Sequence, residues 1–359
     1  MQTHAHIKFC DVSLNSSVQR NQMKKTNSKS QKFLRRATCI ICVIALSIAC
    51  CFNLTACGNS SSDNSTAELA DVKVGTLATE DILPFWVAEN EGLFEEAGIN
   101  ASVEVFQSAT ELIAAVTSGE VQCAMTDPMV TASIYASGTP VQIEWITLGT
   151  DASQGRFGIM TADDSITSLK DLAGVEIGVG SNTILEYVMD TLMENAGIDE
   201  QQIKKNELQK LPVRYEAMTS GQVKAAALPA SLLALGEANG CHVVAGDTTG
   251  DNISQSVMIV NSEFLEDASG ANTVDVLKQV WNKAAGEINA SPESYRSLLV
   301  EKANLSDAIS NTYEICEYPQ CELPSKEMIE PILSWMLDKG YLEEALSYNE
   351  TDGTFQKGE

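Results

Sequence analysis

Short apolar segments alternate with amphipathic segments of helical period in two stretches of this chain. In the first stretch we predict strands at 72–77, 101–106 and 121–126 and helices at 84–97 and 109–118; in the second we predict strands at 175–179 and 225–228 and helices at 183–195, 215–220 and 231–238. Strands that alternate with helices are typical of a mainly parallel sheet with helical crossovers. The pattern therefore predicts an α/β fold.

A sequence repeat relates the two stretches. Residues 115–138 align without a gap onto residues 217–240, and Ala-Val-Thr-Ser-Gly-Glu-Val in the first copy matches Ala-Met-Thr-Ser-Gly-Gln-Val in the second. A period of about 100 residues is the size of a domain, not of a solenoid unit. Glycines 98, 119, 197 and 221 follow predicted helices, where a left-handed cap favours glycine. We predict two similar lobes built on one plan.

The connections between the lobes predict a hinge. Two short apolar strands, at 156–161 and 255–261, let the chain enter the second lobe once and leave it once. The expected boundaries are 71–158 and 255–350 for the first lobe and 159–254 for the second. Helical segments at 272–290, 292–303 and 325–339 follow the return and are expected to pack on the first lobe.

The N-terminal region has the order of charges and apolar residues that an export signal requires. Three basic residues within 32–36 precede the apolar run 37–49, which leads to Leu-Thr-Ala-Cys-Gly at 54–58. Small residues before Cys57 let a signal peptidase cut there and leave a cysteine for lipidation. A single-pass membrane helix, the alternative for such a run, needs no small residues before a cysteine. We interpret the motif as a lipobox.

This interpretation divides the N-terminal region in two. Residues 1–56 are the signal peptide, and an ordinary signal begins at Met23, so the segment before it is an extra extension. Residues 57–70 are rich in Ser, Asn, Asp and Thr and form a lipidated, flexible linker. We expect an extracytoplasmic protein that a lipid such as palmitate anchors to the cell membrane.

Charge and composition exclude some functions. A formal net charge of -26 argues against a nucleic-acid partner, which needs a basic face to neutralise phosphates. After Cys57 the sequence has one histidine, His242, before a Val-Val strand, so acid-base and metal chemistry lack their usual residue. We predict no enzyme activity, no cofactor and no metal site. Whether Cys316 and Cys321 form a disulfide stays open.

Three segments carry a resemblance to a known family. They are Leu-Pro-Phe-Trp-Val-Ala-Glu-Asn-Glu-Gly-Leu-Phe-Glu-Glu-Ala-Gly-Ile at 83–99, Ser-Leu-Lys-Asp-Leu-Ala-Gly at 168–174 and Thr-Ser-Gly-Gln-Val-Lys-Ala-Ala at 219–226. The chain resembles the ABC-transporter substrate-binding proteins of the sulfonate, taurine, nitrate and thiamine-pyrimidine class over nearly all of residues 71–345. The resemblance implies a type II periplasmic-binding fold, a small-molecule solute, and permease and ATPase partners. It departs from the family at Leu-Pro-Ala-Ser, 228–231, where many members have an acidic residue between two prolines.

Loops at the carboxyl ends of the strands are the candidate solute site. In a parallel α/β sheet a ligand lies beyond these ends, where the backbone N–H groups of the next helix are free. The rule selects Thr76, Leu77, Ala78, Thr79, Gln107, Ser108, Ala109, Thr126, Asp127 and Pro128 in the first lobe and Gly180, Ser181, Asn182, Thr183, Leu228 and Pro229 in the second.

Several of these residues also have purely structural interpretations. Ser108 and Thr183 fit helix N-caps, and Asp127 fits a turn before Pro128 as well as a partner for an amine or a ring N–H. Trp86 is either a stacking platform for a flat solute or a core residue.

Two arginines are candidates for an anionic group of the solute. Arg156 lies beside the first crossing, where it is suited to bind an anion or to form an ion pair between the lobes. For Arg214 a surface or interlobe ion pair is the favoured interpretation.

Together these observations predict a monomeric solute-binding lipoprotein of an ABC importer. It captures a sulfonate or taurine, nitrate, or a thiamine-pyrimidine precursor, closes one lobe over it and delivers it to the permease. Two alternatives stay open. One is an enzyme on the same fold, like the thiamine-pyrimidine synthase or a chorismate dehydratase, although the synthase's histidine and cysteine-rich motif do not occur after Cys57. The other is a lobe pair that presents its ligand to a sensor.

Overall fold

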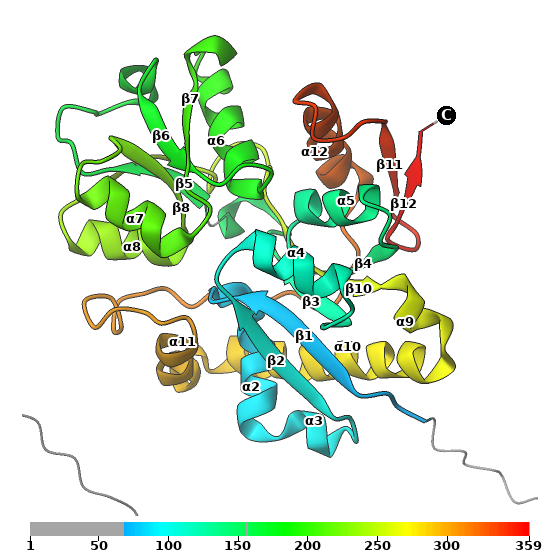
Figure 1. Cartoon of the computed structure of the whole chain (residues 1–359). Helices are drawn as coiled ribbons and strands as arrows, with labels where there is room; N and C mark the ends of the chain where they lie inside the picture. Colours follow the sequence, from blue (N-terminus) through cyan, green and yellow to red (C-terminus); the bar gives the residue numbers. More distant parts are fainter. Residues whose placement is uncertain (1–67, 156, 359) are drawn as a thin grey trace, which may run out of the picture. The chain divides into compact units, whose positions relative to one another are not determined.

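The computed structural model describes residues 68–155 and 157–358, which form two α/β lobes, each on a five-stranded sheet (Figure 1). The predicted α/β class and the two similar lobes are confirmed. The predicted signal peptide, Cys57, most of the linker and Arg156 lie outside the described residues.

The first sheet contains one strand that comes from beyond the second lobe. Its strands are β1 (Val72–Leu77), β2 (Ala101–Phe106), β3 (Cys123–Thr126), β4 (Val141–Leu148) and β10 (Ser256–Asn261). In the order β2-β1-β3-β10-β4, β1 is parallel to β2 and β3, whereas β10 is antiparallel to both of its neighbours. The sheet is therefore mixed, with a single antiparallel strand.

The second sheet repeats this arrangement. Its strands are β5 (Phe157–Thr161), β6 (Glu176–Val179), β7 (Lys204–Glu207), β8 (Ala225–Pro229) and β9 (His242–Gly246). They have the order β7-β6-β8-β5-β9, in which β5 is the antiparallel strand. Both strands predicted as the hinge, β5 and β10, thus lie within a sheet. The segments that cross between the lobes, of which the structure describes 149–155 and 247–255, come just before them.

Helices cover both faces of each sheet. The helices of the first lobe are α2 (Leu83–Glu91), α3 (Leu93–Glu96), α4 (Ala109–Thr117), α5 (Pro128–Ala136), α9 (Ser262–Glu266), α10 (Ala268–Ala290), α11 (Arg296–Lys302) and α12 (Lys326–Asp338). This lobe also has the 3-10 turns η1 (Glu80–Ile82), η2 (Ala152–Gln154) and η5 (Pro292–Tyr295) and the hairpin β11 (Leu346–Asn349) and β12 (Thr354–Lys357). The second lobe has the helices α6 (Ile184–Asn195), α7 (Leu211–Thr219) and α8 (Ala230–Ala238) and the 3-10 turns η3 (Leu169–Leu172) and η4 (Glu200–Gln202).

The sequence repeat corresponds to a structural repeat. Helices α4 and α7 begin at equivalent positions of the two copies, and so do α5 and α8. Gly119 and Gly221 end α4 and α7 with φ of 74° and 75°, the left-handed conformation that was predicted for both.

Some predicted elements differ from the structure. The predicted helix 84–97 divides at Gly92, whose φ of 75° ends α2 before α3 begins. The predicted helix 292–303 starts as the 3-10 turn η5. Strand β7, with the sequence Lys-Lys-Asn-Glu, was not predicted, because an edge strand does not need an apolar face. Strand β4, helix α5 and the β11–β12 hairpin were also not predicted.

Alternating side chains of the first sheet form two separate cores. Val74, Trp145 and Met258 pack with α2 and α10, whereas Ala124 and Ile259 pack with α4, α5 and α12. Figure 1 shows α2 and α10 on one face and α4 and α5 on the other. The period-2 alternation of a strand explains how one sheet serves both cores. The second sheet does the same, with α6 on one face and α7 and α8 on the other.

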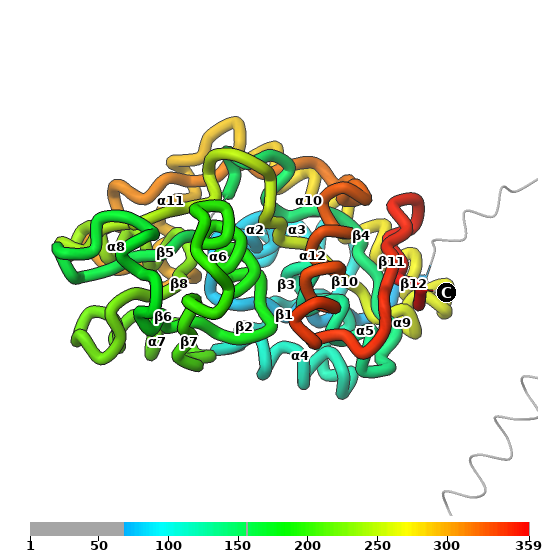
Figure 2. Tube along the Cα trace, turned by 90° about the horizontal axis from the view of Figure 1, so that it is seen from above, coloured from blue at the N-terminus to red at the C-terminus, as the bar shows by residue number. Residues whose placement is uncertain are grey.

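Helix α6 of the second lobe packs directly on the first lobe, beside α12 (Figures 1 and 2). The ring centroids of Tyr187 and Trp335 are 5.6 Å apart. The hydroxyl of Tyr341 donates to Glu186 at 2.9 Å, and Lys339 Nζ lies 3.3 Å from Asp190. The two lobes are therefore joined by a packed interface in addition to the two crossing segments.

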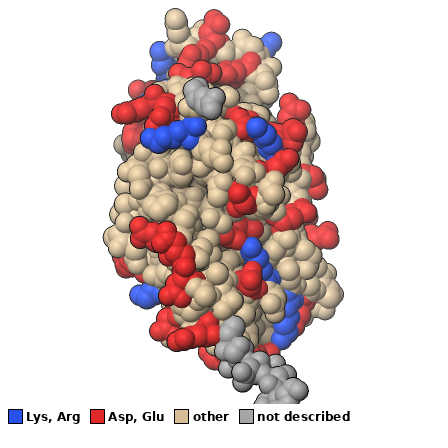
Figure 3. Space-filling view, turned by 90° about the vertical axis from the view of Figure 1, so that its right-hand side faces the viewer, with Lys and Arg blue, Asp and Glu red and all other residues tan. Residues whose placement is uncertain are grey.

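The surface of the described residues is rich in acidic side chains. Figure 3 shows Asp and Glu spread over one face among fewer Lys and Arg, in keeping with the net charge of -26. In the part of the chain that the structure describes, no helix combines the length and apolar character needed to cross a membrane.

An aromatic cluster around Trp281 provides a test of the first core. Trp281 has no exposed surface; its ring centroid lies 5.3 Å from that of Phe85 and 5.8 Å from that of Trp145, and its Nε1 donates to Pro319 O at 3.1 Å. We expect Trp281→Ala to lower the free energy of unfolding by about 3–5 kcal/mol, because it leaves a cavity. Urea denaturation measures this loss.

Two variants serve as comparisons. Trp281→Phe keeps an aromatic ring and should cost less than Trp281→Ala. Leu337→Ala changes an exposed residue of α12 and should alter stability by no more than about 0.5 kcal/mol. Equal losses in Trp281→Ala and Leu337→Ala would contradict the central place of the cluster.

Candidate functional site

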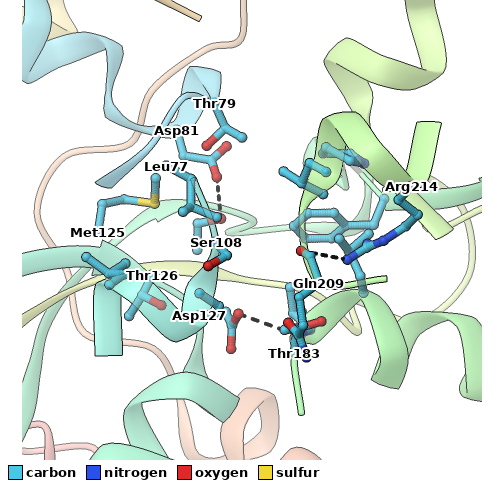
Figure 4. A pocket seen from close by; sticks show the side chains of 18 residues that line it. Leu77, Thr79, Asp81, Ser108, Met125, Thr126, Asp127, Thr183, Gln209 and Arg214 are labelled. Atoms are coloured by element: carbon cyan, nitrogen blue, oxygen red, sulfur yellow. Dashed lines mark hydrogen bonds between the residues drawn. The ribbon is translucent and has the colours of Figure 1, made fainter. Parts of the chain in front are cut away.

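A cavity lies between the two lobes at the carboxyl ends of their parallel strands (Figure 4). It is lined by Leu77, Thr79, Asp81, Ser108, Ala109, Leu112, Met125, Thr126, Asp127, Phe157, Thr183, Ile184, Leu185, Gln209, Leu211, Arg214, Pro229 and Ser256. The cavity is small, about 70 Å³, but a neighbouring groove of about 480 Å³ shares Leu77, Thr79, Leu211 and Pro229 with it. Together they are large enough for a small solute.

Four helices begin at this cavity. Ala109, Ile184 and Leu211 are the first residues of α4, α6 and α7 and line the wall, as does Asp127, the N-cap of α5. The first N–H groups of a helix have no partner within the helix and carry partial positive charge. The backbone therefore makes the wall electropositive before any side chain is counted.

Ser108 both caps a helix and lines the cavity. Its Oγ accepts the N–H of Glu111 at 3.3 Å, and the same residue lines the cavity, so Ser108 is both a cap and a wall residue. Thr183 also lines the cavity, but its hydroxyl donates to Gly180 O at 2.7 Å instead of capping α6. The cap interpretation thus holds for Ser108 and not for the side chain of Thr183.

Asp127 bridges the two lobes with its carboxylate. Oδ1 accepts the N–H of Val130 at 2.8 Å and caps α5, while Oδ2 accepts the N–H of Ile184, the first residue of α6, at 3.4 Å. The side chain is 8% exposed. Burial raises the pKa of Asp127 to about 6, although the backbone N–H bonds lower it in part.

Arg214 is buried and bound to carbonyl groups, so the ion pair favoured from sequence is wrong. Its Nε, Nη1 and Nη2 donate to the carbonyl oxygens of Leu208, Ala227 and Gln209 at 2.8, 2.9 and 3.3 Å. The residue is 1% exposed, and burial lowers its pKa to about 10, although the negative charge of Glu207 raises the pKa in part. A guanidinium has five N–H donors, so two remain beyond these three bonds.

The 3-10 turn η1 places a second carboxylate on the wall. Asp81 accepts the hydroxyl of Ser256, the first residue of β10, at 2.9 Å. The preceding Glu80 is fixed by the hydroxyl of Tyr313 at 2.5 Å, and its carbonyl accepts the hydroxyl of Tyr318 at 2.7 Å. Sequence analysis missed Asp81, Gln209, Phe157 and Ser256, because none of them directly follows a parallel strand.

Nine of the residues named as candidates from the sequence line the cavity. They are Leu77, Thr79, Ser108, Ala109, Thr126, Asp127, Thr183, Pro229 and Arg214; Ala78 and Gln107 line only the neighbouring groove. Figure 4 shows Thr79, Ser108 and Asp127 on one side and Thr183 on the other, with Arg214.

The other predicted residues face elsewhere. Trp86 is 1% exposed and Leu228 has no exposed surface, because both belong to apolar cores; the stacking platform proposed for Trp86 is therefore not at this cavity. The hydroxyl of Thr76 donates to Leu77 O. Ser181 binds Glu207, and Asn182 Nδ2 binds Ser133 across the lobes at 2.7 Å. Arg156 lies outside the described residues.

The remaining candidates for chemistry lie away from this wall. Among residues 68–155 and 157–358, no three His, Cys, Asp or Glu side chains are grouped to hold a metal ion. His242 Nε2 lies 2.7 Å from Ile166 O, a contact within the second lobe. Cys316 and Cys321 do not form a disulfide in the structure.

Comparison with known proteins identifies relatives of the fold. Residues 79–294 match the model of the family described as NMT1/THI5 like. Comparison with curated proteins gives no match.

Solved structures with the same fold include three solute-binding proteins. The alkanesulfonate-binding protein SsuA from Xanthomonas axonopodis pv. citri bound to MOPS is 14% identical, with a TM-score of 0.67 over 77% of this chain and 96% of its own. The periplasmic aliphatic sulphonate-binding protein SsuA from Escherichia coli is 14% identical, with a TM-score of 0.64 over 77% and 94%. The periplasmic nitrate-binding protein NrtA from Synechocystis PCC 6803 is 10% identical, with a TM-score of 0.61 over 77% and 83%.

The buried carboxylate predicts a pH-dependent stability. At pH 8 Asp127 is ionised in both the folded and the unfolded chain, so the cost of burying its charge lowers the free energy of unfolding in full. As the pH falls through 6, the folded protein takes up a proton before the unfolded chain does, and the free energy of unfolding rises. We expect Asp127→Asn, which keeps an N-cap oxygen, to be more stable than the wild type by about 1–3 kcal/mol at pH 8. Denaturation at several pH values should show this difference shrinking towards pH 4. A difference that does not change with pH would contradict the assignment.

Gly180 makes room for Arg214. A Cβ on Gly180 would lie 2.5 Å from Arg214 Nη2 and 3.0 Å from Gln209 Oε1. Since three carbonyl bonds hold the guanidinium in place, we expect Gly180→Ala to cost about 1–3 kcal/mol. Gly286→Ala is the matched control, because its Cβ meets nothing within 4 Å and lies inside α10, where alanine is favoured. Equal thermal stability of the two variants would show that Arg214 moves freely.

Proposed function

We propose, because the chain belongs to the NMT1/THI5-like family and has the fold of periplasmic binding proteins, that it captures a small solute outside the cytoplasm for an ABC importer. The solute binds in the interlobe cavity and passes to a permease that an ATPase drives. We further propose that the chain is exported and that a lipid on Cys57 anchors it to the membrane. The permease and the ATPase are proposed as partners because of the family and the fold, not because of a particular surface of this chain.

The observation that carries this proposal is the buried Arg214 beside four helix N-termini. A buried charge is costly unless a partner or a ligand stabilises it. Carbonyl oxygens hold three N–H donors of Arg214, and the remaining two are suited to an anionic group at the wall. Helix N-termini favour the same kind of group. Among sulfonate, taurine, nitrate and thiamine-pyrimidine precursors, these features favour the oxyanions.

The hydroxyls of the wall complete the proposed contacts. Thr79, Ser108, Thr126 and Thr183 lie around the cavity and are able to donate to an oxyanion. The apolar side chains of Leu77, Leu112 and Met125 would pack against an organic tail that runs into the neighbouring groove. Arg156, at the crossing beside Phe157, stays a proposed contact on the basis of its sequence position.

Solute capture requires the lobes to move. A volume of about 70 Å³ is too small for an alkanesulfonate, so we propose that the cavity widens as the groove opens. The packed contact between α6 and α12 acts as the pivot, and the crossing segments 149–155 and 247–255 bend. An ion pair of Lys210 in the second lobe with Glu111 in the first, at 3.0 Å, also joins the lobes, and it is exposed and easily broken.

Binding without catalysis is the proposed role. The described residues of the wall include neither histidine nor cysteine, and its two carboxylates, Asp81 and Asp127, accept hydrogen bonds from Ser256 and from the N–H groups of Val130 and Ile184. Presentation of the solute to a sensor would use the same cavity, and nothing in its geometry favours that role over import.

Thermal unfolding against a panel of solutes tests the proposal. The panel contains alkanesulfonates, taurine, nitrate, thiamine-pyrimidine precursors and thiamine. A ligand that binds only the folded state at 100 times its Kd stabilises it by about 2.7 kcal/mol, so the midpoint should rise. We expect the largest rise with an oxyanion.

A steric block links the rise to this cavity. Ala109→Trp places a large ring at the wall and should abolish the rise, while Ala114→Trp, at an exposed position of the same helix α4, should preserve it. If Ala109→Trp responds to the solute like the wild type, the solute binds elsewhere. If no solute shifts the midpoint, the proposed solute classes are wrong.

A further inference from the structure

No side chain of its own lobe caps the first N–H groups of helix α6, although Glu186 Oε2 accepts the preceding N–H of Asn182 at 2.7 Å. Its N-cap residue, Thr183, directs its hydroxyl to Gly180 O and makes no capping bond. The N–H of Ile184 is instead bonded to Asp127 Oδ2, at 3.4 Å, from the first lobe. The electropositive end of α6 therefore already has an anion beside it in the structure, and this anion belongs to the protein.

The position of Asp127 is the one that the anionic group of a solute would take. Its carboxylate lies at the N-termini of α5 and α6 together and lines the cavity that Arg214 also lines. Figure 4 shows Asp127 on the first-lobe side, with its carboxylate directed at the start of α6. A second anion here would face repulsion in a site of low dielectric, where charge interactions are strong.

We propose that Asp127 is a tethered anion that competes with an oxyanion solute for the N-terminus of α6, and so sets the pH dependence of solute binding. The inference rests on the proposed function and concerns the same cavity. While it is ionised, Asp127 excludes the solute; when it is protonated, it releases the N–H of Ile184 and no longer repels the oxyanion.

The pH range follows from the burial of this carboxylate. Burial raises the pKa of Asp127 to about 6, so the group changes charge between pH 5 and pH 8. If the oxyanion binds only the protonated form, its affinity should rise roughly 100-fold from pH 8 to pH 5, because each pH unit above the pKa costs a factor of ten.

Other charged groups face the same region and require a control. They are Asp81 of η1, Glu111 of α4, Glu186 of α6 and Arg214 of α7. Glu111 is paired with Lys210, which holds its pKa below the usual range. Any pH dependence that these groups cause will persist when Asp127 is replaced, so the variant separates them from it.

The experiment is calorimetric titration of the purified protein with butanesulfonate and nitrate at pH 5 and pH 8. Both probes keep their charge over this range. The wild type should bind roughly 100-fold more tightly at pH 5, while Asp127→Asn should bind equally at both pH values, close to the wild type at pH 5. Asp267→Asn is the matched control, since Asp267 also caps a helix, α10, but does not line the cavity. It should behave like the wild type.

The outcomes separate this inference from the proposed function. Oxyanion binding that is flat with pH in the wild type, or weaker in Asp127→Asn than in the wild type at both pH values, would overturn the role of Asp127 and leave solute binding intact. Binding of butylamine that Asp127→Asn abolishes would also overturn it, because Asp127 would then be a direct contact for a cation. If sulfonate, nitrate and amine all fail to bind at either pH, the proposed function itself is wrong.

Discussion

The strand that follows each crossing between the lobes is the constraint on which the structure depends. In the spatial order of each sheet, three adjacent parallel strands are followed by an antiparallel strand. The chain forms this antiparallel strand immediately after it crosses from the other lobe. An antiparallel strand begins where its parallel neighbours end. The first residues of β5 and β10, Phe157 and Ser256, therefore lie at the same edge as the loops after β1 and β3 and line the cavity with them. One topological feature thus brings the crossings, the strand ends and four helix N-termini to one place.

Electrostatics at this place has two opposing parts. The helix N-termini and the guanidinium of Arg214 make the wall electropositive, and the protein satisfies Arg214 with carbonyl dipoles, so the positive charge is not cancelled by a carboxylate bonded to it. Asp127 and Asp81 supply negative charge close by. A buried site with both signs is sensitive to the protonation of a single group, because burial raises the free-energy cost of each uncompensated charge.

The sequence predicted the plan of the fold better than the site. The repeat of 115–138 at 217–240 was sufficient for two similar lobes, because the apolar periods and the terminal glycines are local signals. The rule for strand ends found Ser108, Asp127 and Thr183 for the same reason. It missed Asp81, whose position depends on the 3-10 turn after β1. Arg214 was a candidate only because of its charge, and the favoured ion pair was wrong, because carbonyl groups of two other segments hold its guanidinium. The rule also placed Thr76 and Leu228 at the wall, since the direction of a side chain at a strand end is a property of tertiary packing.

The late return of β10 to the first sheet also gives the two lobes different histories during synthesis. The second sheet is complete within residues 157–246, a continuous segment. The first sheet lacks its fourth strand until residue 261 has been made, and its cores lack α10 and α12 until still later. A chain that emerges from its N-terminus therefore holds an unfinished first half, with an open edge at β3, while its middle portion is already able to fold. Until residues 256–261 and the later helices are made, this unfinished half exposes an unpaired strand edge and the apolar faces of its sheet.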